Sequence, residues 1–212
     1  MNISDIKKEF PIFDNKVHNN DLVYLDSANS SQKPRVVIDR IYDFYSKEFS
    51  NVGRSVHYLA VAATNLYEST RVSMQKYINA LDKNEIVFTK GATEAINLVA
   101  NTFGQKYLEE GDEVLLTELE HHSNYVPWHF LRKSKNIKIE FAEINSDGEI
   151  TLDSIEKKIT KKTKIIGVTH LSNVTGAILP IKDIAKLAHS KGIPLLVDGC
   201  QGAPHLKLDM QD

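Results

Sequence analysis

Four polar segments of the chain carry side chains that could do chemistry: Lys90–Ala95, Glu118–Asn124, His170–Gly176 and Asp198–Gly202. Each follows a short apolar run that is typical of a buried strand. Together they offer a hydroxyl at a helix start, an imidazole, an amide and a carboxylate. Each group also has an ordinary structural interpretation, so the four indicate a functional site only if the fold brings them to one place.

The first segment predicts an anion-binding site. Gly91 permits close approach of the backbone, and Thr93 lies in the first turn of a helix that opens near Ala92. The free N–H groups of that turn and the Thr93 hydroxyl could bind a phosphate together. In the alternative interpretation, Glu94 complements the helix dipole and no ligand is involved.

The next two segments offer an imidazole and an amide. His121 could stack on an aromatic ring or act as an acid or base. A metal is not expected, because the adjacent His121 and His122 do not share a face and no spaced acid or cysteine completes a ligand set. Asn173 has both a donor and an acceptor. The alternatives are a surface loop, with Ser123 or Asn124 capping the following helix, and an ordinary turn.

Asp198 is the most informative of the four groups. It follows the apolar run Pro194–Val197, so its carboxylate should be poorly solvated, and an unpaired buried charge is costly. No obvious Lys or Arg partner lies nearby in sequence, so a cationic ligand could neutralise it. The alternative is a carboxylate that caps the following turn. Cys200 is interpreted as a small buried residue rather than a nucleophile.

Apolar runs and segments of helical period alternate along the chain. Strands separated by helices imply right-handed parallel crossovers, and hence a three-layer α/β/α fold with a mainly parallel sheet. Ligands of such folds bind outside the carboxyl ends of the strands, where all four polar segments fall. The expected strands are 22–25, 85–89, 113–117, 137–144, 164–169 and 194–197, and the expected helices are 34–49, 58–78, one from about 92, 124–133, 151–160 and 181–190.

Composition narrows the function classes. The chain has 212 residues, 42% hydrophobic and 25% charged, which is ordinary for a folded, soluble domain. A net charge of -2 argues against nucleic-acid binding, and no apolar run is long enough to span a membrane. A single cysteine and a start without a signal-peptide core favour the cytoplasm.

The four groups together suit a flat heteroaromatic ligand with a phosphate and a protonated ring nitrogen. Pyridoxal 5'-phosphate has these features. A nicotinamide dinucleotide fits less well, because the first turn, Leu25–Ser30, lacks a G-x-G-x-x-G pattern.

Five stretches of the sequence form long, ordered motifs: Leu25–Ala28, Gly91–Ala100, Glu120–Trp128, Thr169–Gly176 and Val197–Gln201. They resemble the cysteine desulfurases, which are class-V, fold-type-I pyridoxal-phosphate enzymes. The His-His-Ser-Asn-x-Val-Pro-Trp segment is similar to the second group of these enzymes, which serve the SUF pathway of iron–sulfur cluster assembly. The likeness runs from about Phe10 to the last residue.

The resemblance implies how the cofactor is held. Thr93 and the main chain at Gly91 and Ala92 would bind its phosphate. His121 would stack on the pyridine ring, and Asp198 would pair with the protonated ring nitrogen.

The remaining roles also come from the resemblance. Gln201 would hydrogen-bond the phenolic oxygen of the cofactor, and Asn173 would contact that oxygen or the substrate carboxylate. Arg54 and Ala28 would contact the substrate. The implied reaction converts L-cysteine to L-alanine and leaves a persulfide on the enzyme. The implied partners are a second copy of the chain, in a homodimer, and a sulfur-acceptor protein of the SUF pathway.

The resemblance also implies a domain layout. Residues 1–20 would form an arm that belongs to the small domain of the full-length protein, and residues 21–212 would form the large cofactor-binding domain, truncated before the Schiff-base lysine. The catalytic cysteine and a substrate-clamping arginine would also lie outside the chain, so this chain alone is expected to be inactive.

One stretch departs from the family pattern, which has His-Arg-Gly before the second long helix. Here Arg54 is kept, but Gly53 and Ser55 take the places of the histidine and the glycine. The departure leaves room for a selenocysteine lyase or another class-V lyase or transaminase. A non-catalytic domain that binds a partner or a cofactor is the alternative from a different class.

Overall fold

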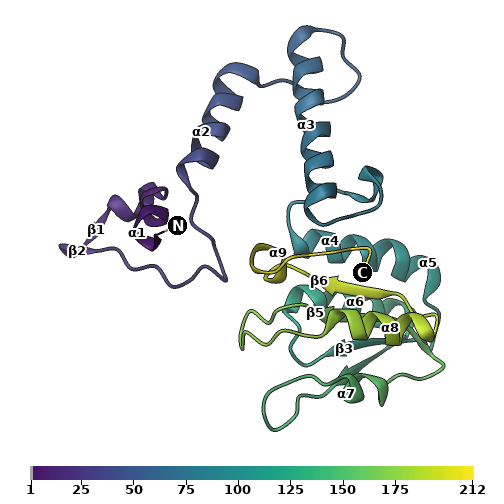
Figure 1. Cartoon of the computed structure of the whole chain (residues 1–212). Helices are drawn as coiled ribbons and strands as arrows, with labels where there is room; N and C mark the ends of the chain where they lie inside the picture. Colours follow the sequence, from purple (N-terminus) through teal and green to yellow (C-terminus); the bar gives the residue numbers. More distant parts are fainter. Residues whose placement is uncertain (1) are drawn as a thin grey trace. The chain divides into compact units, whose positions relative to one another are not determined.

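The computed structural model describes residues 2–212. These divide after Tyr77 into two compact units, and the second unit is Ile78–Asp212 (Figure 1). In the first unit, the helix Arg35–Asp43 continues into a π-helical turn, Phe44–Glu48. The predicted domain boundary near residue 20 concerns the full-length protein and stays a prediction. The elements of the first unit are α1 (Ile3–Lys8), a 3-10 turn (Pro11–Asp14), the antiparallel pair β1 (Lys16–Val17) and β2 (Asn20–Asp21), α2 (Arg35–Asp43), the π turn (Phe44–Glu48) and α3 (Tyr58–Tyr77).

The second unit is built on a parallel sheet of four strands in the order β4-β3-β5-β6. Its strands are β3 (Glu113–Thr117), β4 (Lys138–Ala142), β5 (Thr163–Thr169) and β6 (Leu195–Asp198). Its helices are α4 (Ala92–Val99), α5 (Gln105–Tyr107), α6 (Val126–Lys135), α7 (Leu152–Glu156), α8 (Ile181–Ser190) and α9 (Gly202–His205), with 3-10 turns at Lys83–Glu85 and His122–Asn124 and a π turn at Ala100–Gly104.

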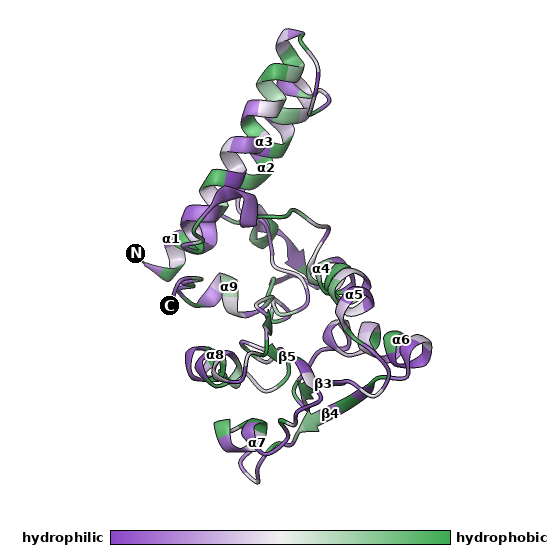
Figure 2. Cartoon of the chain, turned by 90° about the vertical axis from the view of Figure 1, so that its right-hand side faces the viewer, coloured by the Kyte–Doolittle hydropathy of each residue, from purple (hydrophilic) through white to green (hydrophobic). Residues whose placement is uncertain are grey.

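Helices cover both faces of this sheet, which confirms the predicted three-layer α/β fold. Along β3, Leu115 packs into one core with Ile155 of α7 and Ile184 of α8. Its neighbours Val114 and Leu116 face the other core, which also contains Trp128 of α6. This alternation follows from the two-residue period of a strand. Figure 2 shows the result in the helices, where α6 and α8 carry both hydrophobic and polar colours.

Two predicted strands are wrong. Residues 22–25 and 86–89 are not in strands, and Glu85 ends a 3-10 turn. Both runs have the apolar composition of a strand, but a strand also needs a hydrogen-bonded neighbour. The four-strand order includes neither run.

The other elements of the second unit match their predictions with small shifts. The helix α8 has the predicted bounds, and Gly192 follows it with a φ of +70°. A left-handed residue after the last turn is a common helix end. The predicted helix 151–160 is shorter, because α7 ends at Glu156, and Thr151 caps its start by accepting the Ser154 N–H at 3.1 Å. Within residues 2–212, no helix is long and apolar enough to cross a membrane.

Candidate functional site

The carboxyl ends of β3, β5 and β6 meet at one edge of the sheet. Thr169, the last residue of β5, is in register with Asp198, the last residue of β6. The His170 N–H donates to the Asp198 carbonyl at 2.9 Å. Two of the four predicted segments therefore start side by side, as parallel strands require.

Asp198 is buried, with 7% of its surface exposed. Its Oδ1 accepts the Cys200 N–H at 3.0 Å, so one oxygen does cap the next turn, as the alternative interpretation holds. Among residues 2–212, no Lys or Arg lies within ion-pair distance of this carboxylate. The charge of Asp198 therefore has no cationic side chain to offset it within that range.

A cavity of about 230 Å³ joins Asp198 to the start of α4. Gly91 is the N-cap of this helix and offers no side-chain cap, so the N–H groups of the first turn lack an acceptor within the helix. The lining is mostly apolar and contains a single charged residue. It consists of Ala92, Ala95, Ile96, Val99, Leu196, Val197, Asp198, Gly199 and Cys200.

Thr93 and His121 are linked through a residue to which the sequence assigned only a capping role. The Thr93 Oγ1 lies 2.8 Å from the Ser123 Oγ, which lies 2.8 Å from the His121 Nδ1. The Ser123 N–H also donates to this Nδ1, at 3.1 Å. Because a backbone N–H can only donate, Nδ1 is an acceptor and the proton of a neutral ring lies on Nε2. The structure thus brings the predicted anion site and the predicted imidazole together.

The start of α4 also agrees with the alternative interpretation, in which Glu94 stabilises the helix N-terminus and no ligand is involved. Glu94 accepts the Lys90 N–H at 2.5 Å, a contact typical of a helix N-terminus. The Thr93 side chain is exposed.

Asn173 and Gln201 lie on the two loops that follow β5 and β6. Asn173 is exposed on a tight loop, where Ser172 Oγ accepts the N–H groups of Val174 and Thr175. Gln201 is half-buried at the start of α9. The roles predicted for both side chains stay predictions.

Ala28 and Arg54 belong to the first unit, where both are exposed. Their predicted substrate contacts also stay predictions.

Cys200 is exposed, so its interpretation as a buried residue is wrong. Partial burial and the charge of Asp198 raise the pKa of its thiol. A raised pKa lowers the thiolate fraction, which is unfavourable for a nucleophile. Within residues 2–212, no group of three or more His, Cys, Asp or Glu side chains could hold a metal ion.

Glu120 is a site residue to which the sequence assigned no role. Its Oε1 accepts the Thr169 N–H at 2.8 Å and the Thr117 hydroxyl at 2.6 Å, and its Oε2 accepts from Asn124 Nδ2 at 2.8 Å. The pKa of Glu120 is raised to about 7, mainly by burial and to a smaller extent by the charge of Asp198, against the lowering effect of the three hydrogen bonds.

Gly167 is the sequence signal that could have revealed this network. A glycine inside an apolar strand often marks close approach of another group. A Cβ at Gly167 would lie 2.8 Å from Leu116 Cδ2 and 3.2 Å from Asn124 Nδ2. The buried Asn124 amide therefore packs directly over the backbone of β5.

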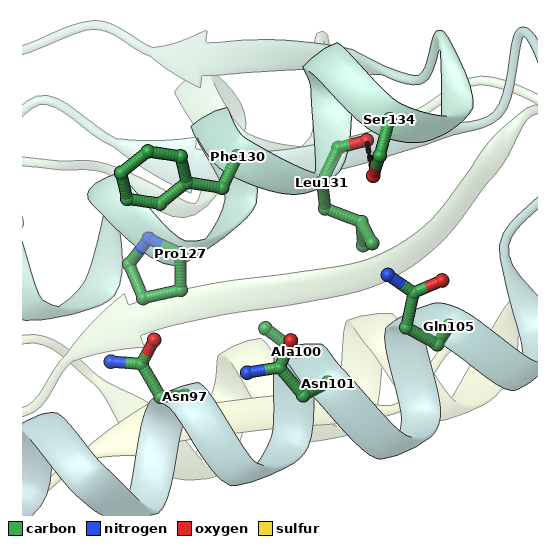
Figure 3. A pocket seen from close by; sticks show the side chains of 8 residues that line it. All are labelled: Asn97, Ala100, Asn101, Gln105, Pro127, Phe130, Leu131 and Ser134. Carbon is green, nitrogen blue, oxygen red and sulfur yellow. Dashed lines mark hydrogen bonds between the residues drawn. The ribbon is translucent and has the colours of Figure 1, made fainter.

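A second cavity, of about 350 Å³, lies between the α4–α5 segment and α6 (Figure 3). One side carries three amides, Asn97, Asn101 and Gln105, and the other carries side chains of α6, including Phe130 and Leu131. None of the residues predicted for the site lines it, so it is separate from the cavity beside Asp198.

The chain matches known proteins along its whole length. The profile of the aminotransferase class-V family matches residues 23–212. A probable cysteine desulfurase of Halalkalibacterium halodurans is 47% identical over 212 residues, and one of Staphylococcus aureus is 46% identical over the same length. The chain spans about half the length of these curated relatives, 52% and 51% respectively.

Solved structures agree with these matches. A cysteine desulfurase of Thermococcus onnurineus matches with a TM-score of 0.91 and 34% identity, over 100% of this chain and 51% of that one. A cysteine desulfurase of Escherichia coli matches with a TM-score of 0.86 and 34% identity, over 100% of this chain and 52% of that one. The family profile covers most of the sequence, and the chain therefore belongs to the aminotransferase class-V family.

Proposed function

We propose that the full-length protein is a pyridoxal-phosphate-dependent cysteine desulfurase. The observation that carries the proposal is the cavity that joins the start of α4 to the buried Asp198. Its lining includes Asp198 and Ala92, the first residue of α4. A helix N-terminus favours an anion such as a phosphate, and a buried carboxylate favours a cation such as a protonated ring nitrogen. The names of the curated relatives support the same activity.

The residues of the second unit fit this cofactor. Thr93 and the main chain at Gly91 and Ala92 hold the phosphate. Asp198 keeps the ring nitrogen protonated, and His121 stacks on the ring, with its Nδ1 engaged by Ser123 N–H and its Nε2 carrying the proton. When bound, pyridoxal phosphate supplies an electron sink for bond cleavage in the substrate.

Roles are also proposed for the other predicted residues. Gln201 donates a hydrogen bond to the phenolic oxygen of the cofactor, and Asn173 contacts that oxygen or the substrate carboxylate. Arg54 and Ala28 contact the substrate.

In the proposed reaction, the thiolate of a catalytic cysteine attacks the sulfur of the substrate L-cysteine. A sulfur–sulfur bond forms and the carbon–sulfur bond of the substrate breaks. L-Alanine leaves, and the sulfur stays on the enzyme as a persulfide. The proposed biological setting is a cytoplasmic homodimer that passes this sulfur to an acceptor of the SUF pathway for iron–sulfur cluster assembly.

The full-length protein is expected to release L-alanine from L-cysteine when it is loaded with pyridoxal phosphate. The measurement is alanine and sulfide formation in the presence of a reductant, with L-selenocysteine as the competing substrate. Preferential turnover of selenocysteine would favour a selenocysteine lyase. Cofactor binding without turnover of either substrate would favour a non-catalytic cofactor-binding protein.

Residues 1–212 on their own are expected to show no sustained turnover of L-cysteine. The resemblance places the covalent lysine, the catalytic cysteine and the clamping arginine outside this stretch. The measurement is alanine release by the 212-residue chain with added cofactor, run beside the full-length protein. Several turnovers per chain would contradict this expectation.

A further inference from the structure

Glu120 accepts hydrogen bonds from three parts of the structure at the carboxyl edge of the sheet. Its carboxylate accepts from Thr117 at the end of β3, from Thr169 at the end of β5 and from Asn124 just before α6. The register of β3 with β5 extends to Leu115 and Ile166. Thr169 lies beyond that point, so a side-chain carboxylate takes the place of a strand carbonyl as the acceptor for its N–H.

The neighbouring hydrogen bonds fix which partner donates to Glu120. The Trp128 indole N–H, which can only donate, points at Asn124 Oδ1 at 3.2 Å, so Asn124 Nδ2 must face Glu120. The Thr117 hydroxyl accepts the Leu119 N–H at 3.3 Å and is therefore free to donate to Glu120. All three partners of the carboxylate are donors.

This carboxylate is connected to both residues to which the site gives a chemical role. His121 is the next residue in the chain, and it begins the 3-10 turn His122–Asn124 as its N-cap. Asp198 is in register with Thr169, whose N–H Glu120 accepts, and the charge of Asp198 acts on Glu120. Anchoring Glu120 therefore sets the position of the His121 backbone relative to Asp198.

We propose that Glu120 is a positioning residue that holds His121 in place over the cofactor through its three accepted hydrogen bonds. The inference rests on the proposed function, because it needs a bound cofactor on which His121 would stack. Glu120 itself does not touch the reacting atoms.

The test replaces Glu120 by glutamine in the full-length protein and uses pyridoxal phosphate as the probe. The glutamine amide has nearly the same shape, but its NH2 group must face either Asn124 Nδ2 or the donors Thr117 and Thr169. Losing one such hydrogen bond is expected to weaken binding of the cofactor by about tenfold. Visible circular dichroism of the bound cofactor is expected to shrink, because it reports the packing of the ring.

A double variant restores the pattern of donors and acceptors. In E120Q combined with N124D, the glutamine NH2 donates to one aspartate oxygen and Trp128 Nε1 donates to the other. The double variant is expected to recover cofactor affinity to within about threefold of the wild type, because every donor in the network again faces an acceptor. The matched control is E118Q, because Glu118 is an exposed carboxylate on the same loop whose Oε2 accepts the Ile144 N–H at 2.9 Å.

The outcomes separate this inference from the function on which it rests. A wild-type protein that takes up no pyridoxal phosphate overturns the proposed function, and this inference with it. Normal uptake by the wild type with unchanged affinity and dichroism in E120Q overturns only the role of Glu120. If E120Q does not fold, the double variant decides, because recovery of folding without recovery of the dichroic band contradicts positioning of His121.

Discussion

Replacing Asp198 by alanine in the full-length protein is expected to weaken binding of pyridoxal phosphate by about two to three powers of ten. Removing one partner of a buried ion pair costs about 3–5 kcal/mol, and about 1.4 kcal/mol corresponds to tenfold. Turnover of cysteine is expected to fall as well, because in the proposed site the ring nitrogen loses the carboxylate that would keep it protonated. A fluorescence titration measures the affinity, and alanine release measures the rate.

Two further variants isolate the charge of Asp198. Asp198→Asn keeps an oxygen to accept the Cys200 N–H but has no negative charge, so it is expected to show most of the loss. Asp183→Asn changes an exposed aspartate on α8 and is expected to bind the cofactor normally. An Asp198→Ala protein that keeps its full colour and rate would show that the pyridinium role is wrong.

The stability of the cofactor-free protein gives an independent test of the same claim. Without a cation, the charge of Asp198 is buried and acts unfavourably on Glu120. Asp198→Asn should therefore leave the melting temperature of the cofactor-free protein unchanged or higher, while reducing the rise that the cofactor causes. If the Asp198 carboxylate had a purely structural role, its replacement would lower the melting temperatures of the cofactor-free and the cofactor-bound protein equally.

The sequence predicts those elements whose pattern depends only on local burial. The period of α8 and the stop at Gly192 are local features, and the structure has them where they were expected. The run 85–89 shows the limit of such reasoning, because a strand needs a neighbour and composition does not reveal one. The four-strand order of the sheet leaves this run out.

The site shows the same division between local and long-range features. The meeting of Thr169 with Asp198 follows from parallel strands, so it could be predicted. The link from Thr93 through Ser123 to His121 joins the first turn of α4 to the loop between β3 and α6, and its side-chain directions are set by packing. Glu120 was not predicted because two of its three partners are distant or packing-dependent: the backbone N–H of Thr169 and the Asn124 amide, whose orientation depends on Trp128.

Replacing Trp128 by alanine is expected to be the most destabilising single change in the second unit, at about 3–5 kcal/mol. Trp128 is fully buried in the core between α6 and the sheet, at 0% exposure. Its removal leaves a large cavity and also leaves Asn124 Oδ1 without its donor. The measurement is the free energy of unfolding of the full-length protein by chemical denaturation.

Trp128→Phe separates the two contributions, because phenylalanine keeps an aromatic ring in the core but has no N–H. The stability that Trp128→Phe loses is expected to be smaller than that lost by Trp128→Ala. It is about 1–3 kcal/mol, the range for a buried acceptor left without a partner. The orientation of Asn124 is then no longer fixed, so its amide can turn its oxygen toward Glu120 and repel that carboxylate. Cofactor affinity should therefore fall in Trp128→Phe although the tryptophan is remote from the proposed ligand. A Trp128→Phe protein with normal affinity and lowered stability would show that the Trp128–Asn124–Glu120 chain of hydrogen bonds supports the fold without positioning the site.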